Sequence, residues 1–281
     1  MTSVGSQEDA ARTEAADRVL APFGRRDLGV TAREQHGAYV VLRAQDPGGP
    51  LPQAGQFYML SAAARWGGGA GGRPFLPRAF SVLRALPAEP SGVELQFLLE
   101  DVGPGTRRLC ELGAGEELTV LGPLGSGFRP PRNGRRALLV GGGVGIAPLA
   151  IWQDQLDHDA PALLGFRDAA RAHGAHLLSN VRLATEDGSG GHRGLVTDLL
   201  QAALELASDA VEVYACGPAP MLEAVRLACA ERGTPAQLAL ESGMACGFGA
   251  CFGCVVPTRS GYVRLCLDGP VLDAELLEAE P

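Results

Sequence analysis

Four cysteines near the end of the chain have the spacing of metal-ligating residues. Cys246, Cys251 and Cys254 fall within a span of nine residues inside the stretch ESGMACGFGACFGCVVPT. Eleven residues then separate Cys254 from Cys266. Four thiolates are the ligand set of a [2Fe–2S] cluster, and C-x4-C-x2-C followed by a more distant cysteine is the plant-type ferredoxin spacing. The spacing therefore predicts a one-electron carrier.

The composition of this loop supports the same interpretation. The backbone must wrap closely around a cluster, and we expect glycines to allow the necessary angles at four positions: Gly243, Gly247, Gly249 and Gly253. Phe248 and Phe252 are candidates to shield the cluster. The rival metal is structural zinc, which favours C-x2-C pairs, and the loop has one such pair. Four unrelated buried thiols would leave the glycines unexplained.

A second chemical feature is a glycine turn between an apolar strand and a helix, ALLVGGGVGIAPL. Backbone N–H groups at such a turn can approach a pyrophosphate, although Ile146 breaks the G-x-G-x-x-G pattern and a plain tight turn is the alternative. CGPAPM, at the end of a later strand, would face the same crevice. The residues predicted to bind NAD are Gly141, Gly142, Gly143, Gly145, Cys216, Gly217, Pro218 and Met221.

Cys216 is also the one candidate for a catalytic position, near the nicotinamide. It ends a strand and opens a helix, so either the helix N-terminus lowers its pKa or a ligand lies against it. Cys110 and Cys229 stand in apolar helical settings and are expected to be inert core thiols.

A third feature is RAFS, on a short strand nearer the N-terminus. A guanidinium suits a pyrophosphate, an aromatic ring can pack on a flavin, and a hydroxyl can bond to a ring nitrogen. GPGTRRL, which follows, is a probable helix start of the kind that binds phosphate. The residues predicted to bind FAD are Arg78, Ala79, Phe80, Ser81, Gly105 and Thr106.

The elements that position these residues change character along the chain. The first part alternates short apolar runs with turns, which predicts a small antiparallel barrel: AYVVLRA, GQFYMLSA, RAFSVLRA, VELQFLLE and EELTVLGP. From Arg135, strands alternate with helices and AQLAL is the last strand, which predicts a doubly wound parallel sheet. The fold class is therefore β plus α/β. The predicted parts are a disordered leader at 1–17, a flavin-binding barrel at 18–132, an NAD-binding α/β domain at 133–239 and a cluster module at 240–281.

Composition narrows the function classes. The chain has 281 residues and a formal net charge of −8, which argues against a nucleic-acid partner. The sequence shows no secretory signal, and its longest apolar run is too short and glycine-rich to span a membrane. The sequence predicts a cytoplasmic protein, in a compartment where clustered thiols stay reduced and bind metal or do redox chemistry.

Together the motifs resemble a known superfamily. RAFS, GPLGSGF, GGGVGIAPL and CGPAPM resemble the ferredoxin reductases, in which an FAD-binding barrel precedes an NAD(P)-binding domain. ATEDGSGGHRGLVTDLL, CGPAPML and the cysteine loop resemble the electron transfer subunits of NAD-dependent (type B) dihydroorotate dehydrogenase, from about Arg18 to Leu272. Ala79 stands where the family often has Pro, AGQF replaces PGQF, and the GGGAGG insertion at 67–72 is unusual.

The resemblance implies an electron path and a partner. A flavin exchanges one or two electrons, so FAD would stand between the one-electron cluster and NAD. None of the five histidines belongs to a nucleophile or carboxylate constellation, so substrate oxidation is expected on another chain. In the family that chain is an FMN-containing dihydroorotate dehydrogenase subunit of pyrimidine biosynthesis, in a complex of two of each chain.

Two alternatives remain, and so does the choice of nucleotide. One alternative is a subunit of an NAD(P)H–ferredoxin or sulfide-type reductase with the same module order. The other is a non-catalytic iron–sulfur scaffold or redox sensor. Phe166, Arg167 and Asp168 follow the second strand of the α/β domain, where an acidic residue favours NAD and an arginine accommodates NADP. The local signal is mixed, and the resemblance favours NAD.

Overall fold

The computed structural model describes residues 24–68, 73–88, 92–156, 159–206 and 210–278. The leader predicted at 1–17 lies outside the described residues, and so does most of the GGGAGG insertion, at 69–72.

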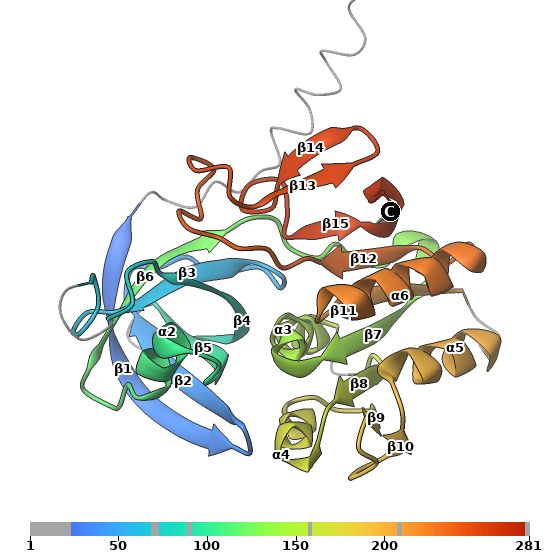
Figure 1. The fold of residues 1–281 in the computed structure, drawn as a ribbon, viewed down its shortest axis with the longest axis horizontal. Helices are drawn as coiled ribbons and strands as arrows, with labels where there is room; N and C mark the ends of the chain where they lie inside the picture. Colours follow the sequence, from blue (N-terminus) through green and yellow to red (C-terminus); the bar gives the residue numbers. More distant parts are fainter. Residues whose placement is uncertain (1–23, 69–72, 89–91, 157–158, 207–209, 279–281) are drawn as a thin grey trace, which may run out of the picture.

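The first part of the chain is a closed six-stranded antiparallel barrel with the strand order β1-β2-β5-β4-β3-β6 (Figure 1). Its strands are β1 (Arg25–His36), β2 (Tyr39–Asp46), β3 (Phe57–Ala62), β4 (Arg78–Pro87), β5 (Val93–Glu100) and β6 (Glu117–Leu124). One helix, α2 (Pro104–Cys110), follows β5. The predicted runs correspond to β2 through β6. The sequence reasoning missed β1, because only Leu28 and Val30 of this charged strand are buried and the apolar alternation is too weak to be recognised.

The second part is a seven-stranded sheet in the order β10-β9-β8-β7-β11-β12-β15. Its strands are β7 (Arg136–Gly142), β8 (Ala162–Phe166), β9 (Val181–Thr185), β10 (His192–Arg193), β11 (Val211–Cys216), β12 (Ala236–Ala239) and β15 (Val271–Asp273). The helices and short 3-10 turns around it are η1 (Arg132–Gly134), η2 (Gly143–Gly145), α3 (Ile146–Gln155), α4 (Ala169–Ala172), η3 (His173–Leu177), α5 (Val196–Leu206), α6 (Ala219–Glu231) and η4 (Ala274–Leu276). The strands from β7 to β12 pair in parallel with helices between them, which confirms the predicted fold class.

The edge of this sheet differs from the prediction. AQLAL is not the last strand, because β15 pairs antiparallel with β12 and places Leu272 opposite Leu238. Three residues are too few for a recognisable alternation, so β15 could not be recognised from its residues alone. The sheet thus extends into the segment that carries the cysteines.

The barrel and the α/β part are held against each other by helix α3 and two arginines. Helix α3 packs between the sheet and β4 (Figure 1). Arg84 on β4 pairs with Asp154 on α3, with Nε 2.9 Å from the carboxylate, and Arg171 on α4 pairs with Glu100 on β5 at 2.7 Å. These contacts fix the cleft between the two parts.

The cysteine segment lies across the top of both parts in Figure 1. Its loop leaves β12, passes over β3 and β6, and leads into a hairpin made of β13 (Val255–Thr258) and β14 (Gly261–Arg264). Across the described ranges, no helix combines the length and apolar character needed to cross a membrane.

Candidate functional site

The four cysteines of the loop are all free thiols and form two pairs. The Cys251 thiol donates to the sulfur of Cys246, and the backbone N–H of Cys266 donates to the sulfur of Cys254 at 3.5 Å, with the two thiols also in contact. Cys254 and Cys266 are buried at the base of the hairpin, whereas Cys251 is exposed. Two pairs of thiols suit two iron ions with two thiolates each.

The surroundings of the first thiol favour its ionised form. Burial raises the pKa of Cys246, but backbone N–H groups of Phe248, Cys251 and Ala250 donate to its sulfur, and the net result lowers the pKa to about 7. Burial, followed by the contact with Cys254, raises the pKa of Cys266 to about 12. Backbone donors aimed at a sulfur are what a cluster-binding thiolate requires.

Two of the four glycines in the loop have the backbone role expected for them. Gly247 and Gly249 adopt φ of +79° and +83°, the left-handed region. A Cβ on Gly247 would lie 2.5 Å from Met59, and one on Gly249 would lie 2.4 Å from Leu267, so both positions also need a bare backbone. Gly243 and Gly253 have neither feature, and the expectation for them was wrong.

The aromatic residues of the loop do not bury the cysteines. Phe252 is 63% exposed, and the Arg264 guanidinium carbon lies over its ring, 5.0 Å from the ring centre. Phe248 is 38% exposed. Among the described residues, no three His, Cys, Asp or Glu side chains gather around one point as a single metal ion requires. A structural zinc ion needs four such ligands around one point.

A cavity of about 190 Å³ lies where the barrel, the α/β part and the start of the cysteine loop meet. Three residues predicted to bind FAD line it together: Ala79, Phe80 and Ser81. Gly145 and Cys216 face them from the α/β part. Apolar side chains and a few polar groups line the cavity together, as is usual in small-molecule sites.

Arg78 stands outside this cavity, against helix α2. A Cβ on Gly105 would lie 2.7 Å from the Arg78 guanidinium, so the glycine allows the close approach. The guanidinium also lies 5.9 Å from the centre of the Trp66 ring and donates to the Leu76 carbonyl at 2.6 Å. The Thr106 hydroxyl is engaged within its own turn, because it donates to the Gly103 carbonyl and accepts from the backbone N–H of Val102.

We infer that the Arg78 guanidinium and the start of α2, which lie in contact, bind one diphosphate from the same side, and this gives a test. We expect Arg78→Ala to weaken FAD binding by about tenfold or more, since a hydrogen bond to a charged group contributes about 1.5–3 kcal/mol. The measurement is the dissociation constant of FAD from the refilled apoprotein, followed by flavin fluorescence. The cluster absorption should persist.

The matched control for that test is Arg182→Ala, at an exposed arginine of β9 that lines none of the cavities described in this article. It should leave FAD binding unchanged. Equal FAD affinity in the Arg78→Ala variant and the parent would contradict the assignment.

A larger cavity, about 530 Å³, lies along the carboxyl ends of the parallel strands. Six residues predicted to bind NAD line it: Gly142, Gly143, Gly145, Gly217, Pro218 and Met221. Gly141 does not, because it packs against Leu149, Leu164 and Ile146. Cys216 lines the smaller cavity instead, the one of about 190 Å³ beside Ala79, Phe80 and Ser81, which we call the flavin-side cavity.

Two glycines let the strand ends come together at this cavity. A Cβ on Gly145 would lie 2.5 Å from the Cys216 carbonyl oxygen, and one on Gly142 would lie 2.6 Å from the sulfur of Met221. Burial, with a smaller effect of Glu241, raises the pKa of Cys216 well above its usual value. Of the two expectations for this thiol, the lowered pKa was wrong, and the position against a ligand cavity agrees with the structure.

At the end of β8 the structure separates two neighbours that the sequence left ambiguous. Arg167 lines the large cavity, whereas Asp168 caps α4: its carboxylate accepts from the Arg171 backbone N–H and pairs with the Arg171 side chain at 2.6 Å. These bonds, the backbone one foremost, hold the pKa of Asp168 below its usual value. Glu186 lines the cavity nearby, and so does Glu100, which pairs with Arg171.

Glu241 is a candidate functional residue that the sequence analysis did not single out. It lines both cavities, so it stands where they meet. The residue is open to solvent from the cleft, but protein surrounds its carboxyl on most sides, and this loss of hydration raises the pKa. Its signal in the sequence was its place at the start of ESGMACG, directly after the last parallel strand.

Comparisons with known families identify the cysteine segment and most of the chain. Residues 241–278 match the model of the iron-sulfur cluster binding domain of dihydroorotate dehydrogenase B. The chain is 36% identical to the dihydroorotate dehydrogenase B (NAD(+)) electron transfer subunit of Caldanaerobacter subterraneus, and 33% identical to that of Clostridium perfringens. Each match covers 81% of this chain and 87% of the relative.

Solved structures show the same fold. An NADH-dependent reduced ferredoxin-NADP oxidoreductase superposes with a TM-score of 0.74 at 22% identity, over 90% of each chain. The ferredoxin reductase of carbazole 1,9a-dioxygenase superposes with a TM-score of 0.62 at 23% identity, over 76% of this chain and 67% of its own.

Proposed function

This chain belongs to the family of dihydroorotate dehydrogenase B electron transfer subunits, and from this premise we propose how its residues carry electrons between a catalytic partner and NAD. The chain is an oxidoreductase subunit with a [2Fe–2S] cluster, FAD and NAD as its redox groups. The family membership decides against the ferredoxin or sulfide-type reductase and the non-catalytic sensor.

One observation carries the assignment of residues: a single short segment connects all three sites. Glu241 lines both cavities, Ser242 and Met244 line the flavin-side cavity, and Cys246 carries the first thiol of the loop. The order of the sites along this segment is the order that the electrons need. A cluster moves one electron, a nicotinamide takes two as hydride, and a flavin between them can do both.

The residues of the chain have separate tasks in this scheme. Cys246, Cys251, Cys254 and Cys266 hold the cluster, Arg78 with Gly105 holds the FAD diphosphate, and Ala79, Phe80 and Ser81 form the wall against which the flavin ring lies. Gly142, Gly143, Gly145, Gly217, Pro218 and Met221 hold the nucleotide so that its nicotinamide reaches the junction of the cavities.

The partner is a catalytic dihydroorotate dehydrogenase subunit. We propose that it contains FMN, that two copies of each chain form the complex, and that the complex is cytoplasmic and acts in pyrimidine biosynthesis. We further propose that NAD is used rather than NADP, because relatives that match four fifths of this chain carry NAD(+) in their names. The nucleotide cavity is lined by Glu186, which can bind a free ribose hydroxyl, and by Arg167, which can accommodate a 2′-phosphate, so the choice of NAD rests on the relatives.

The division of labour gives the test of the function. The isolated chain, filled with FAD and cluster, should reduce a one-electron dye with NADH but should not oxidise dihydroorotate. NAD reduction by dihydroorotate should appear when the catalytic subunit is added, measured as NADH absorbance. Dihydroorotate oxidation by the isolated chain, or no coupling in the reconstituted complex, would overturn the proposal.

A further inference from the structure

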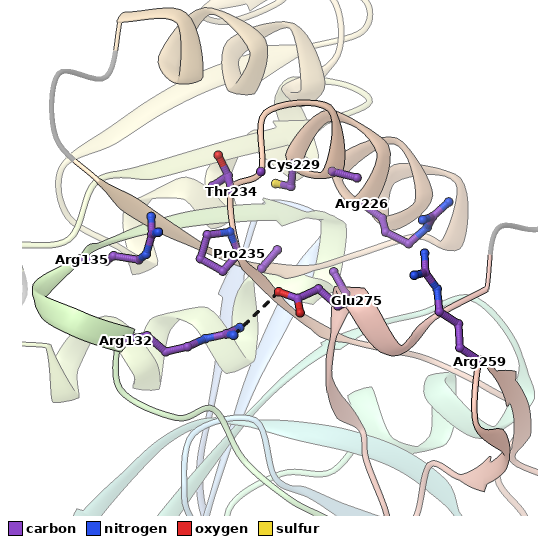
Figure 2. A pocket seen from close by; sticks show the side chains of 12 residues that line it. Arg132, Arg135, Arg226, Cys229, Thr234, Pro235, Arg259 and Glu275 are labelled. Carbon is purple, nitrogen blue, oxygen red and sulfur yellow. Dashed lines mark ion pairs between the residues drawn. The ribbon is translucent and has the colours of Figure 1, made fainter.

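Four arginines line a cavity at the opposite edge of the sheet from the nucleotide cavity. The cavity has a volume of about 470 Å³ and lies where β7 and β12 begin (Figure 2). Arg132 and Arg135 come from the approach to β7, Arg226 from α6, and Arg259 from the turn of the β13–β14 hairpin. Among the described residues, one acidic side chain, Glu275, lines the same cavity.

Two of these arginines have structural ion pairs. Arg226 is 5% exposed and makes a two-pronged bond to Glu223, at 2.7 and 2.6 Å. Arg132 bonds Glu212 at 3.3 Å and Asp273 at 3.2 Å, and Glu275 is a more distant partner at 3.8 Å. Their charges are largely balanced by the protein itself.

The other two have no carboxylate partner within the described part of the chain. Arg135 donates one bond, from Nη1 to the Val211 carbonyl at 3.2 Å, and the Arg259 side chain makes no ion pair there. Figure 2 shows the guanidinium groups of Arg226 and Arg259 turned toward each other across one end of the cavity. Glu223 balances the charge of Arg226, so the charges that a bound anion would neutralise are those of Arg259 and Arg135.

We propose that this cavity binds a small phosphate-bearing anion of the sugar phosphate or pyrophosphate class. The planar guanidinium fork matches phosphate oxygens in pairs, which explains why arginine lines the site from three separate segments. The volume is within the range of about 300–1,000 Å³ that small-ligand sites have. The described residues that line the cavity include no aromatic side chain on which a nucleobase could stack.

The position of Arg259 gives the bound anion a structural effect. Its hairpin connects Cys254 to Cys266, which we assign to the cluster, and the turn is closed by the Thr258 hydroxyl on the Gly261 carbonyl at 2.7 Å. The Arg259 backbone N–H donates to the Leu276 carbonyl at 2.9 Å. This bond holds the turn beside Glu275, which lines the cavity. Figure 2 shows Arg259 and Arg135 at opposite ends of the cavity, so an anion held by both spans it and clamps the hairpin onto the α/β part.

The test uses the full chain with FAD and cluster bound, in saturating NAD so that the known nucleotide site is filled. Inorganic phosphate, pyrophosphate and ribose 5-phosphate are titrated by calorimetry at constant ionic strength, with sulfate and AMP alongside. We expect saturable binding with one site per chain. Hydrogen exchange of residues 255–264 should slow when pyrophosphate or ribose 5-phosphate is bound.

The variants separate a specific site from general charge. Arg259→Ala and Arg135→Ala should each weaken binding by about tenfold or more, and Arg259→Lys should weaken it less, since charge remains but the fork is lost. Arg182→Ala should bind as the parent does. All variants should keep the parent's flavin and cluster absorption.

Four results would overturn the proposal: no saturable binding of any phosphate, binding unchanged in both alanine variants, sulfate as tight as the phosphates, or AMP tighter than ribose 5-phosphate. A hexaglutamate peptide is titrated in the same way. If it binds more tightly than every phosphate, the cavity is a docking site for an acidic protein segment and the phosphate assignment is wrong.

Discussion

Cys266→Ser is expected to remove the cluster and, with it, all transfer of electrons from dihydroorotate to NAD. Cys266 is 1% exposed and its backbone N–H donates to the Cys254 sulfur, so it belongs to the buried pair of the ligand set. A serine hydroxyl is a much poorer ligand for iron than a thiolate. The measurements are iron content, visible absorption, and NAD reduction with the catalytic subunit present.

The same variant should keep most of its NADH-to-dye activity, because a dye can accept electrons from the flavin directly. Cys110→Ser, at a buried thiol of helix α2, is the matched control and should keep the cluster. Cys251 is exposed, so Cys251→Ser repeats the test without disturbing the core. The ligand assignment fails if Cys110→Ser loses the cluster while Cys251→Ser and Cys266→Ser retain it.

The sequence predicted the parts of this fold whose physics is local. Strands such as β2 and β5 show alternating or continuous apolar residues between turns, and the cluster cysteines lie in one short stretch of the chain. Both patterns can therefore be recognised from the sequence alone. The strand β1 was missed because charged residues occupy it, and β15 because it is three residues long and depends on pairing with β12. Tertiary pairing decides both.

Contacts between residues far apart in the chain could not be predicted from the sequence. Arg78 was expected on a pyrophosphate, but its approach to helix α2 depends on the absence of a side chain at Gly105, 27 positions later. Gly141 belongs to the same motif as Gly142, yet it faces helix α3 instead of the cavity. A strand turns successive residues to opposite sides, so a motif alone does not tell which of its glycines contact the ligand.

Glu241 became a candidate only when the two cavities were seen to meet at it, and it supports the second large prediction. Its carboxylate places a negative charge beside the expected position of the nicotinamide, which is cationic when oxidised. We expect Glu241→Gln to slow NADH-to-dye turnover on the order of a hundredfold, the range for a positioned acid–base or charged group. Stopped-flow reduction of the flavin by NADH measures this directly.

The pH dependence of that rate follows from the raised pKa of the carboxyl. If the carboxylate is the active form, the rate of the parent should fall as pH decreases through this raised pKa, and the Glu241→Gln profile should be flat there. Glu205→Gln is the matched control, because Glu205 is an exposed carboxylate of α5 that lines neither cavity. An equal loss of rate in both variants would show that Glu241 has no special place at the junction.

Stability should change in the opposite direction from activity. Because the folded-state pKa is above the unfolded one, the folded protein binds the proton more tightly, and ionisation of Glu241 opposes folding as pH rises through that interval. Glutamine carries no charge and removes this penalty. The Tm of Glu241→Gln should therefore exceed that of the parent by an amount that grows as pH rises from the usual glutamate pKa of about 4.3 through the raised folded-state pKa. A Tm difference that stays constant over this range, together with an unchanged hydride rate, would mean that the carboxylate at the junction is neither strained nor used.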